Sequence, residues 1–226
     1  MDPAETVHNT LISALRTGAL PPVRTALSPE QAGLSAPELV GMFQSQILSR
    51  QLDRIARKLQ GRGEGFYTIG SSGHEGNAAL ATASRVGDIA FLHYRDAAFQ
   101  IERARQLPGQ TPVWDMLLSF AASAEDPISG GRHKVLGSKV LNIPPQTSTI
   151  ASHLPKAVGA AFSIGIAGKL GLETPLAEDA VVLCSFGDAS ANHSTAQGAI
   201  NCASWAAYQG SPMPIVFLCE DNGIGI

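Results

Sequence analysis

The stretch Ala180-Val-Val-Leu-Cys-Ser-Phe-Gly-Asp-Ala-Ser-Ala-Asn192 is followed later in the chain by a second stretch of the same kind, Pro214-Ile-Val-Phe-Leu-Cys-Glu-Asp-Asn-Gly-Ile-Gly-Ile226. Each stretch is a short apolar run that stops at a polar corner containing glycine, the pattern of a buried strand followed by a turn. The alanine-rich segment between them is long enough for a crossover helix. Together they form a βαβ unit, whose strands are parallel. The sequence therefore predicts an α/β fold with a mostly parallel sheet and helices on both faces.

Asp188 and Asn222 directly follow these two predicted strands. Parallel strands joined by a crossover end at the same edge of the sheet, where open α/β folds bind ligands. With the main-chain carbonyl of Ile224, the two side chains would form an all-oxygen cage that suits Mg²⁺ shared with ligand phosphates. Gly187 allows close approach of a phosphate, and a helix beginning near Ser190 would point its N–H groups at the same place. We predict a metal and diphosphate site, the alternative being an ordinary Gly-Asp corner without metal.

A second group of candidate ligands lies in residues 88–96, Asp-Ile-Ala-Phe-Leu-His-Tyr-Arg-Asp. The pattern predicts a short strand that ends in a polar cluster at the start of a helix over residues 97–106. Tyr94 and Arg95 are suitable diphosphate ligands, because arginine offers a planar fork and a helix N-terminus adds positive potential. The alternative is a surface ion pair between Arg95 and Asp96.

The segments before this cluster indicate one long helix and one unusual loop. Ser35 can cap a helix over residues 37–60 whose apolar stripe is predicted to be core, with Arg50 and its charged neighbours on a solvated face or, alternatively, at a subunit contact. Residues 61–76 are dense in glycine, which suggests a backbone that turns tightly or approaches something bulky. His74 and Glu75 in this loop would contact ligand or cap the next helix. Residues 134–141 suggest a mobile loop.

Composition is that of an ordinary globular protein. The chain has 226 residues, 44% of them hydrophobic and 15% charged, with a net charge of −3. It carries no basic block, so a nucleic-acid partner is not expected. Residues 1–25 favour neither a secretory signal nor a membrane span, and no membrane partner is expected. Cys184 and Cys219 are predicted to be buried in strands of a cytoplasmic protein.

The two strand-end corners resemble a known cofactor fingerprint. Gly187-Asp188-Ala189 followed by Asp221-Asn222 is similar to the thiamine-diphosphate motif, in which Gly-Asp-Gly precedes Asn-Asn by about thirty residues. Ala189 replaces the third glycine and Asp221 the first asparagine, and neither change removes a predicted metal ligand. The motifs around it keep the order of one family: Phe66-Tyr67, Gly73-His-Glu-Gly76, Tyr94-Arg95, Gly130-Gly-Arg132 and residues 148–161.

By these motifs the chain is similar to the alpha subunit, or alpha half of a fused chain, of the thiamine-diphosphate-dependent decarboxylating component of 2-oxoacid dehydrogenase complexes, the branched-chain type most of all. The resemblance implies a three-layer thiamine-diphosphate-binding domain over residues 35–226, incomplete at its C-terminus. Residues 1–34 hold four of the fourteen prolines, which predicts an N-terminal arm that is extended or disordered. It places Ser148 near the cofactor's aminopyrimidine and Ile150 where a bulky side chain holds the cofactor bent. Plain core is the alternative for Ile150. No role carries over to His93 or His133.

The activity implied is oxidative decarboxylation of a 2-oxo acid, a branched-chain substrate before pyruvate, with acyl transfer to the lipoyl-bearing acyltransferase. The activating glutamate of this family comes from a beta subunit or fused beta domain, so no catalytic residue is assigned in this chain. The chain alone should be inactive, and the complete enzyme is expected to be an oligomer. Glu75, Asp96 and Glu220 are expected on the diphosphate side, where Glu220 would repel phosphate. A transketolase-like enzyme and a non-catalytic thiamine-diphosphate-binding subunit are the alternatives.

Overall fold

The sheet and helices follow one another in the order expected of an α/β domain. The computed structural model describes residues 3–22, 27–132 and 135–223. The elements in chain order are α1 (Pro3–Thr17), α2 (Ala36–Gly61), the short 3₁₀ helix η1 (His74–Asn77), α3 (Ala78–Thr82), β1 (Ala90–Phe91), α4 (Ala97–Ala104), α5 (Pro112–Phe120), β2 (Leu136–Ser138), β3 (Ile143–Gln146), α6 (Leu154–Leu170), β4 (Val182–Gly187), η2 (Asp188–Asn192), α7 (Ser194–Tyr208) and β5 (Ile215–Glu220).

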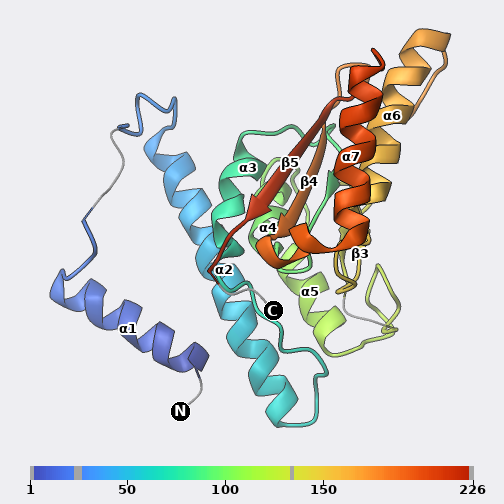
Figure 1. Cartoon of the computed structure of the whole chain (residues 1–226). Helices are drawn as coiled ribbons and strands as arrows, with labels where there is room; N and C mark the ends of the chain where they lie inside the picture. Colours follow the sequence, from blue (N-terminus) through green and yellow to red (C-terminus); the bar gives the residue numbers. More distant parts are fainter. Residues whose placement is uncertain (1–2, 23–26, 133–134, 224–226) are drawn as a thin grey trace.

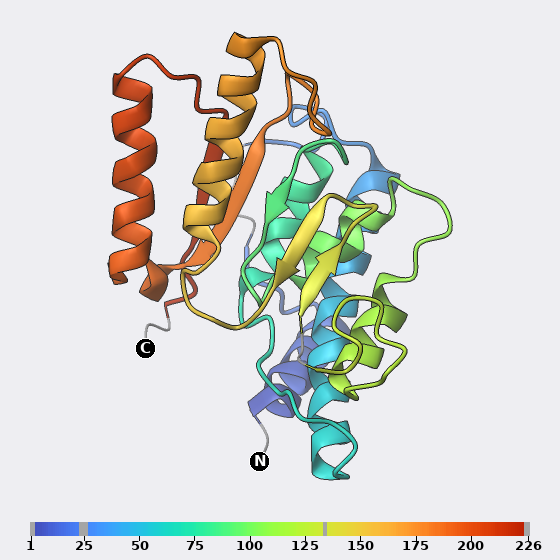
Figure 2. The same ribbon diagram turned by 90° about the vertical axis from the view of Figure 1, so that its right-hand side faces the viewer.

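The three strands of the main sheet are parallel and stand in the order β1-β4-β5. Strand β4 leads through α7 into β5, and their pairing runs from Val182 opposite Ile215 to Gly187 opposite Glu220. This confirms the predicted βαβ unit. Helices α6 and α7 lie side by side along one face of the sheet, and α3 and α4 lie on the other (Figures 1 and 2). The predicted mixed fold with a parallel sheet is therefore present.

Alternating side chains of β4 build two separate cores. Val182, Cys184 and Phe186 pack against apolar residues of α6 and α7. Leu183 points the other way and packs with residues of α3 and α4. Because side chains alternate along a strand, Ser185 lies on the same face as Leu183 and is carried toward the start of α4. Burial on both faces explains why the β4 sequence is almost continuously apolar.

Helix α2 begins where the sequence predicts. The Ser35 hydroxyl accepts a hydrogen bond from the Glu38 main chain at 3.4 Å, and the Glu38 carboxylate accepts one from the Ser35 main chain at 2.7 Å. This reciprocal pair is a capping box. The prediction for its apolar stripe was only partly right, because Leu52 is buried at 3% exposure whereas Val40 is 55% and Phe43 52% exposed.

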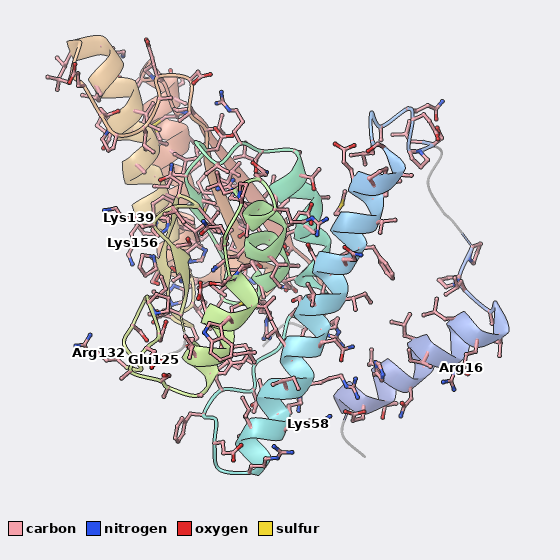
Figure 3. All side chains as sticks on the ribbon, turned by 180° about the vertical axis from the view of Figure 1, so that it is seen from behind. Arg16, Lys58, Glu125, Arg132, Lys139 and Lys156 are labelled. Atoms are coloured by element: carbon pink, nitrogen blue, oxygen red, sulfur yellow. The ribbon has the colours of Figure 1, made fainter. Side chains whose placement is uncertain are left out.

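The charged face of α2 differs from the expected solvated surface. Arg54 binds Glu5 of α1 through two hydrogen bonds of 3.0 and 2.9 Å. The predicted N-terminal arm thus contains a regular helix, which lies outside α2 on the side away from the sheet (Figure 1). The expected extended or disordered arm is therefore partly wrong, and the helical spacing of Val7, Leu11 and Leu15 is the sequence signal that indicates this helix. Elsewhere exposed basic residues such as Arg16, Lys58 and Lys156 project from different helices (Figure 3).

Two features correct the expectations for strands. Residues 136–138 form β2, which pairs with β3 in an antiparallel hairpin where a mobile loop was predicted (Figure 2). Cys219 is exposed, whereas Cys184 is buried as predicted. The reason is that β5 pairs only with β4 among the described strands, and its side chains are less covered. Within the described residues, no helix is both long and apolar enough to cross a membrane.

Candidate functional site

The carboxyl ends of the three parallel strands meet at one edge of the sheet. His93, Tyr94 and Arg95 follow β1, Gly187 and Asp188 end β4, and residues 220–222 end β5. The loop before η1 reaches the same edge, because the Asn222 side chain donates a hydrogen bond of 2.7 Å to the Ser72 carbonyl. We call this region the strand-end corner. The metal and diphosphate ligands that the sequence predicted within the described residues lie at these strand ends or directly after them.

The β4 side of the strand-end corner supplies the Asp188 carboxylate and the 3₁₀ turn that begins with it. Asp188 is half-buried at the first position of η2, Ala189 is half-buried beside it, and Ser190 is buried at 4% exposure. A Cβ added to Gly187 would lie 3.6 Å from His93 Nε2 and 3.8 Å from His74 Cε1, ordinary contact distances, so the end of β4 packs directly against these two histidines. The predicted helix near Ser190 begins later, at Ser194, because the 3₁₀ turn η2 comes first.

The β5 side supplies an oriented amide. The Asn222 amide nitrogen is used by the Ser72 carbonyl, so a metal at the strand-end corner would be bound through the amide oxygen. Gly73 makes this contact possible: it has a φ of +99°, and a Cβ there would lie 3.0 Å from Asn222 Cβ. A carboxylate and an amide oxygen on neighbouring strand ends are a donor set that fits Mg²⁺. The predicted third ligand, Ile224, lies outside the described residues.

Tyr94 and Arg95 are placed by the turn between β1 and α4. The Tyr94 ring is 8% exposed and lies with its centroid 3.9 Å from that of His93. The Arg95 guanidinium lies 5.2 Å from the Tyr94 centroid and donates a hydrogen bond of 2.7 Å to the Gly70 carbonyl. The glycine-dense loop is therefore fastened to the strand-end corner by Arg95. The alternative of a surface pair with Asp96 is wrong, since Asp96 is fully buried.

A buried cluster of polar and charged groups adjoins the strand-end corner, shares Glu220 with it, and was not foreseen from the sequence. His74 Nδ1 lies 3.1 Å from Asp96 Oδ1 and 3.2 Å from Glu220 Oε2. Asp96 also accepts hydrogen bonds from the His93 main chain, at 2.8 Å, and from the Ser185 hydroxyl. We call His74, Asp96, Ser185 and Glu220 the buried ionic cluster. Its members come from η1, the start of α4, β4 and β5.

Charge in the buried ionic cluster is set by burial and by close partners. Burial alone would lower the pKa of His74, but hydrogen bonds and charge from Asp96 and Glu220 outweigh it and raise that pKa to about 9. Burial also acts to raise the pKa of Asp96, yet the His74 hydrogen bond and the neighbouring imidazoles hold it below its usual value. Burial and the charge of Asp96 raise the pKa of Glu220 to about 8. His74 and Asp96 therefore form an ion pair at neutral pH.

Two further histidines near the strand-end corner are kept neutral. Burial lowers the pKa of His93 to about 3, and the charge of Asp96 only partly opposes this. Burial likewise lowers the pKa of His153. His153 Nε2 donates to the Ser185 carbonyl at 2.6 Å, which leaves Nδ1 as a buried acceptor without a hydrogen-bond partner in the described part of the chain.

The predicted cofactor loop before α6 is more open than the rest of the site. Ser148 is half-buried and Ile150 is 38% exposed, so plain core is the wrong interpretation of Ile150. An exposed aliphatic side chain in the loop that leads into His153 remains compatible with contact to a ligand. His133, to which no role was assigned, lies outside the described residues.

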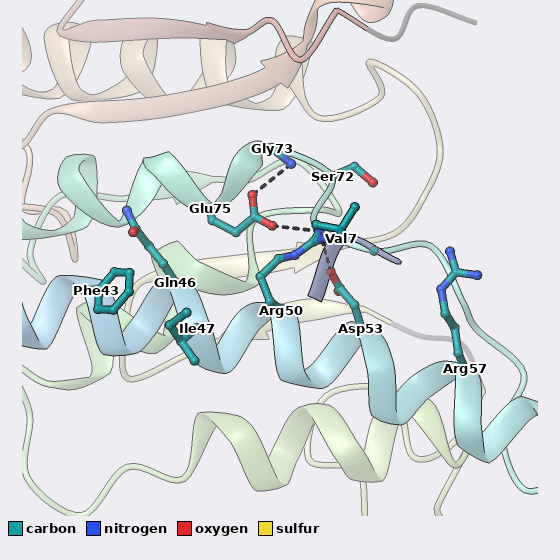
Figure 4. A pocket seen from close by; sticks show the side chains of 11 residues that line it. Val7, Phe43, Gln46, Ile47, Arg50, Asp53, Arg57, Ser72, Gly73 and Glu75 are labelled. Atoms are coloured by element: carbon teal, nitrogen blue, oxygen red, sulfur yellow. Dashed lines mark hydrogen bonds and ion pairs between the residues drawn. The ribbon is translucent and has the colours of Figure 1, made fainter. Parts of the chain in front are cut away.

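The loop that carries His74 is braced from α2. Arg50 binds the carboxylates of Asp53, at 3.3 Å, and Glu75, at 3.0 Å, and Glu75 accepts a hydrogen bond of 2.9 Å from the Gly73 main chain (Figure 4). Burial raises the pKa of Asp53, and its carboxylate also accepts from the Ser71 main chain at 3.0 Å. Neither η1 nor α3 has a side-chain cap, so the capping role expected for Glu75 is not observed, and its carboxylate instead binds Arg50 and the Gly73 main chain. Phe43 and Ile47 line a cavity of about 580 Å³ beside these groups.

Comparison with known proteins shows the family of this chain. The family model described as the dehydrogenase E1 component matches residues 43–226, so the chain belongs to the dehydrogenase E1 component family. The chain is 29% identical to the 2-oxoisovalerate dehydrogenase subunit alpha of Bacillus subtilis over 86% of its own length and 54% of the relative's. It is 26% identical to the mitochondrial 2-oxoisovalerate dehydrogenase subunit alpha of Mus musculus, over 87% of the chain and 40% of the relative.

A third relative shows the same pattern of coverage. The mitochondrial 2-oxoisovalerate dehydrogenase subunit alpha of Homo sapiens is 25% identical over 87% of this chain and 40% of its own length. The chain thus spans about half, or less, of the length of these curated relatives. The family is one of enzymes that depend on thiamine diphosphate, so the strand-end corner is the part of the chain to examine for that cofactor.

Proposed function

We propose that this chain is the cofactor-binding alpha portion of an enzyme that oxidatively decarboxylates a 2-oxo acid with thiamine diphosphate and Mg²⁺ and passes the acyl group to a lipoyl carrier. The observation that supports it most is the position of Asp188 and Asn222. They follow neighbouring parallel strands in register, and the amide of Asn222 is oriented by the Ser72 carbonyl. These are hard oxygen ligands at the place where an α/β sheet binds phosphorylated cofactors.

In this proposal the residues of the strand-end corner bind and orient the cofactor. Asp188 and Asn222 hold Mg²⁺, with Ile224 as the proposed third ligand, while Gly187, Ala189 and Ser190 provide the backbone approach to the diphosphate. When bound, thiamine diphosphate would supply the electron sink for decarboxylation.

The remaining contacts are proposed on either side of that diphosphate. Tyr94 and Arg95 stand at the N-terminal end of α4, where a phosphate would meet the positive end of the helix. Ser148 and Ile150 would contact the aminopyrimidine end of the cofactor, and Ile150 is exposed enough to do so.

We propose a branched-chain 2-oxo acid as substrate, with pyruvate next. The relatives described above support this choice, because their names specify 2-oxoisovalerate, a branched-chain 2-oxo acid. The partners in the proposal are a beta subunit or fused beta domain, which supplies the activating glutamate, and the lipoyl-bearing acyltransferase.

The test is CO₂ release from 2-oxoisovalerate and from pyruvate, with thiamine diphosphate, Mg²⁺ and an artificial electron acceptor. The chain alone should be silent, and the complete protein with its beta portion should be active, faster on 2-oxoisovalerate. Turnover by residues 1–226 alone would show that the activating carboxylate belongs to this chain. Cofactor binding by the complete protein without CO₂ from either acid would identify a non-catalytic subunit.

A further inference from the structure

Glu220 is the last residue of β5 at the strand-end corner, and a negative charge there would disfavour binding of a diphosphate. Its Cα pairs in register with Gly187, the residue before Asp188, and it stands two positions before Asn222. A carboxylate there that faced a diphosphate would repel it strongly, because the sheet edge is partly shielded from water. The structure nevertheless keeps this carboxyl only 11% exposed.

Two side chains of η1 account for that burial. His74 Nδ1 lies 3.2 Å from Glu220 Oε2, and Asn77 Nδ2 donates to Glu220 Oε1 at 3.5 Å. Both oxygens of the carboxyl are thus bound from the same short helix, on the α3 side of the sheet. Asp96 fixes His74 in turn, at 3.1 Å on the same imidazole nitrogen.

The carboxyl has space to leave this position. Glu220 lines a cavity of about 470 Å³ together with His74, Asn77 and Asn222. If the contacts from η1 were lost, the Glu220 side chain would be free to turn within this cavity toward Asn222, which lines it as well. The contacts from η1 therefore decide whether the strand-end corner presents a negative charge to its ligand.

We propose that His74, assisted by Asn77, is a positioning residue that holds the Glu220 carboxyl away from the strand-end corner, so that the corner accepts a diphosphate. The proposal rests on the proposed function, since the diphosphate is that of the cofactor. It assigns a role to the histidine and to the acid at position 220, which the sequence suggested would weaken phosphate binding.

The test is a double-mutant cycle measured as the Kd of thiamine diphosphate with Mg²⁺, by titration calorimetry on the complete protein with its beta portion. His74→Ala should weaken binding about tenfold or more, the size expected for one like charge brought close to the diphosphate. Glu220→Gln alone should leave the Kd unchanged or lower it. In the double variant, binding should return to within about twofold of Glu220→Gln, because the charge that His74 restrains is gone.

A second variant covers the case in which His74→Ala does not fold. Asn77→Asp keeps the size of the side chain but replaces the donor that faces Glu220 by an acceptor, so it should weaken binding in the same direction and be corrected by Glu220→Gln. Loss of affinity that Glu220→Gln does not correct would show a merely structural role and overturn the inference. A wild-type protein that binds no thiamine diphosphate would instead overturn the proposed function, and the inference with it.

Discussion

Asp188 is the only carboxylate among the three proposed metal ligands, so the metal should depend on it most. Replacing Asp188 by Ala leaves two neutral oxygens to bind a dication, and Mg²⁺-dependent binding of thiamine diphosphate should be abolished. Titration calorimetry with the cofactor and Mg²⁺ measures this directly.

Asp221→Ala provides the matched control for that experiment. Asp221 is an exposed aspartate at the end of the neighbouring strand, and its carboxylate accepts a hydrogen bond of 2.8 Å from the Gly223 main chain. Cofactor affinity should therefore change little in this variant. Equal losses in both variants, or none in Asp188→Ala, would place the metal elsewhere.

His93 should make the protein sensitive to acid. Its pKa of about 3 in the folded protein lies below the ordinary value of 6.5, so the unfolded chain binds the proton first. Stability due to neutral His93 is therefore complete above pH 6.5 and is lost as the pH falls toward 3, by about 1.4 kcal/mol per pH unit at most. Urea unfolding at pH 7 and pH 5 should show a smaller loss for His93→Gln than for the wild type.

The same comparison can refute this explanation. His153, whose pKa is also lowered by burial, remains in the His93→Gln variant, so a residual acid sensitivity is expected. If the variant loses as much stability as the wild type between the two pH values, then protonation of His93 does not lower the free energy of unfolding, and this explanation is contradicted.

At the residue scale, the sequence predicted part of the site and missed the rest for a physical reason. Asp188 and Asn222 were predictable because both follow apolar runs, and parallel strands bring their ends together. The buried ionic cluster was not, because Glu220 meets His74 across 146 positions of sequence and no periodicity records that contact. The only sequence signal of this cluster was Glu220, an acid at a position where a diphosphate was expected.

At the scale of elements, α4 contains a buried arginine that contacts three other segments. Arg103 is fully buried and donates hydrogen bonds to the Asp88 carbonyl at 2.7 Å, the Leu141 carbonyl at 3.3 Å and the Ser84 hydroxyl at 2.9 Å. These partners precede β1, connect β2 to β3 and follow α3. One side chain therefore fastens α4 to three other segments.

Arg103→Met should lower the free energy of unfolding by roughly 2 to 4 kcal/mol, because it removes these donors and leaves buried carbonyls unsatisfied. Denaturant unfolding measures the change. Arg105→Met is the control: Arg105 is 48% exposed and lies 3.8 Å from Glu102, so its loss should cost under about 1 kcal/mol. Similar costs for the two variants would contradict the role given to Arg103.

The main helices and the parallel strands were predictable, and the small elements were less so. Helix α2 has a capping box and a clear period, which sequence patterns detect well. The hairpin was missed because β3 contains Pro144 and Pro145, residues that argue against a strand. They are tolerated here because the hairpin has only two strands, so β3 has a free edge in its own sheet. The exposed side of α2 was missed because a helical period does not show which apolar residues are covered.

At the scale of the whole molecule, three acids near the strand-end corner are held by contacts within the protein. Glu75 is bound by Arg50, Asp96 is fully buried, and Glu220 is tied to His74. None of the three is placed to reach the aminopyrimidine side of a cofactor whose diphosphate lies at the strand ends. This supports the proposal that the activating carboxylate is supplied by a beta portion.

The most direct test of the central claim is a crystal structure of the complete protein with its beta portion, grown with thiamine diphosphate and with Mn²⁺ in place of Mg²⁺. Mn²⁺ takes the same hard oxygen ligands and is located by its anomalous scattering. We predict a single peak within coordination distance of the Asp188 carboxylate and the Asn222 amide oxygen, in contact with the diphosphate. A metal and diphosphate bound away from these two side chains would contradict the account.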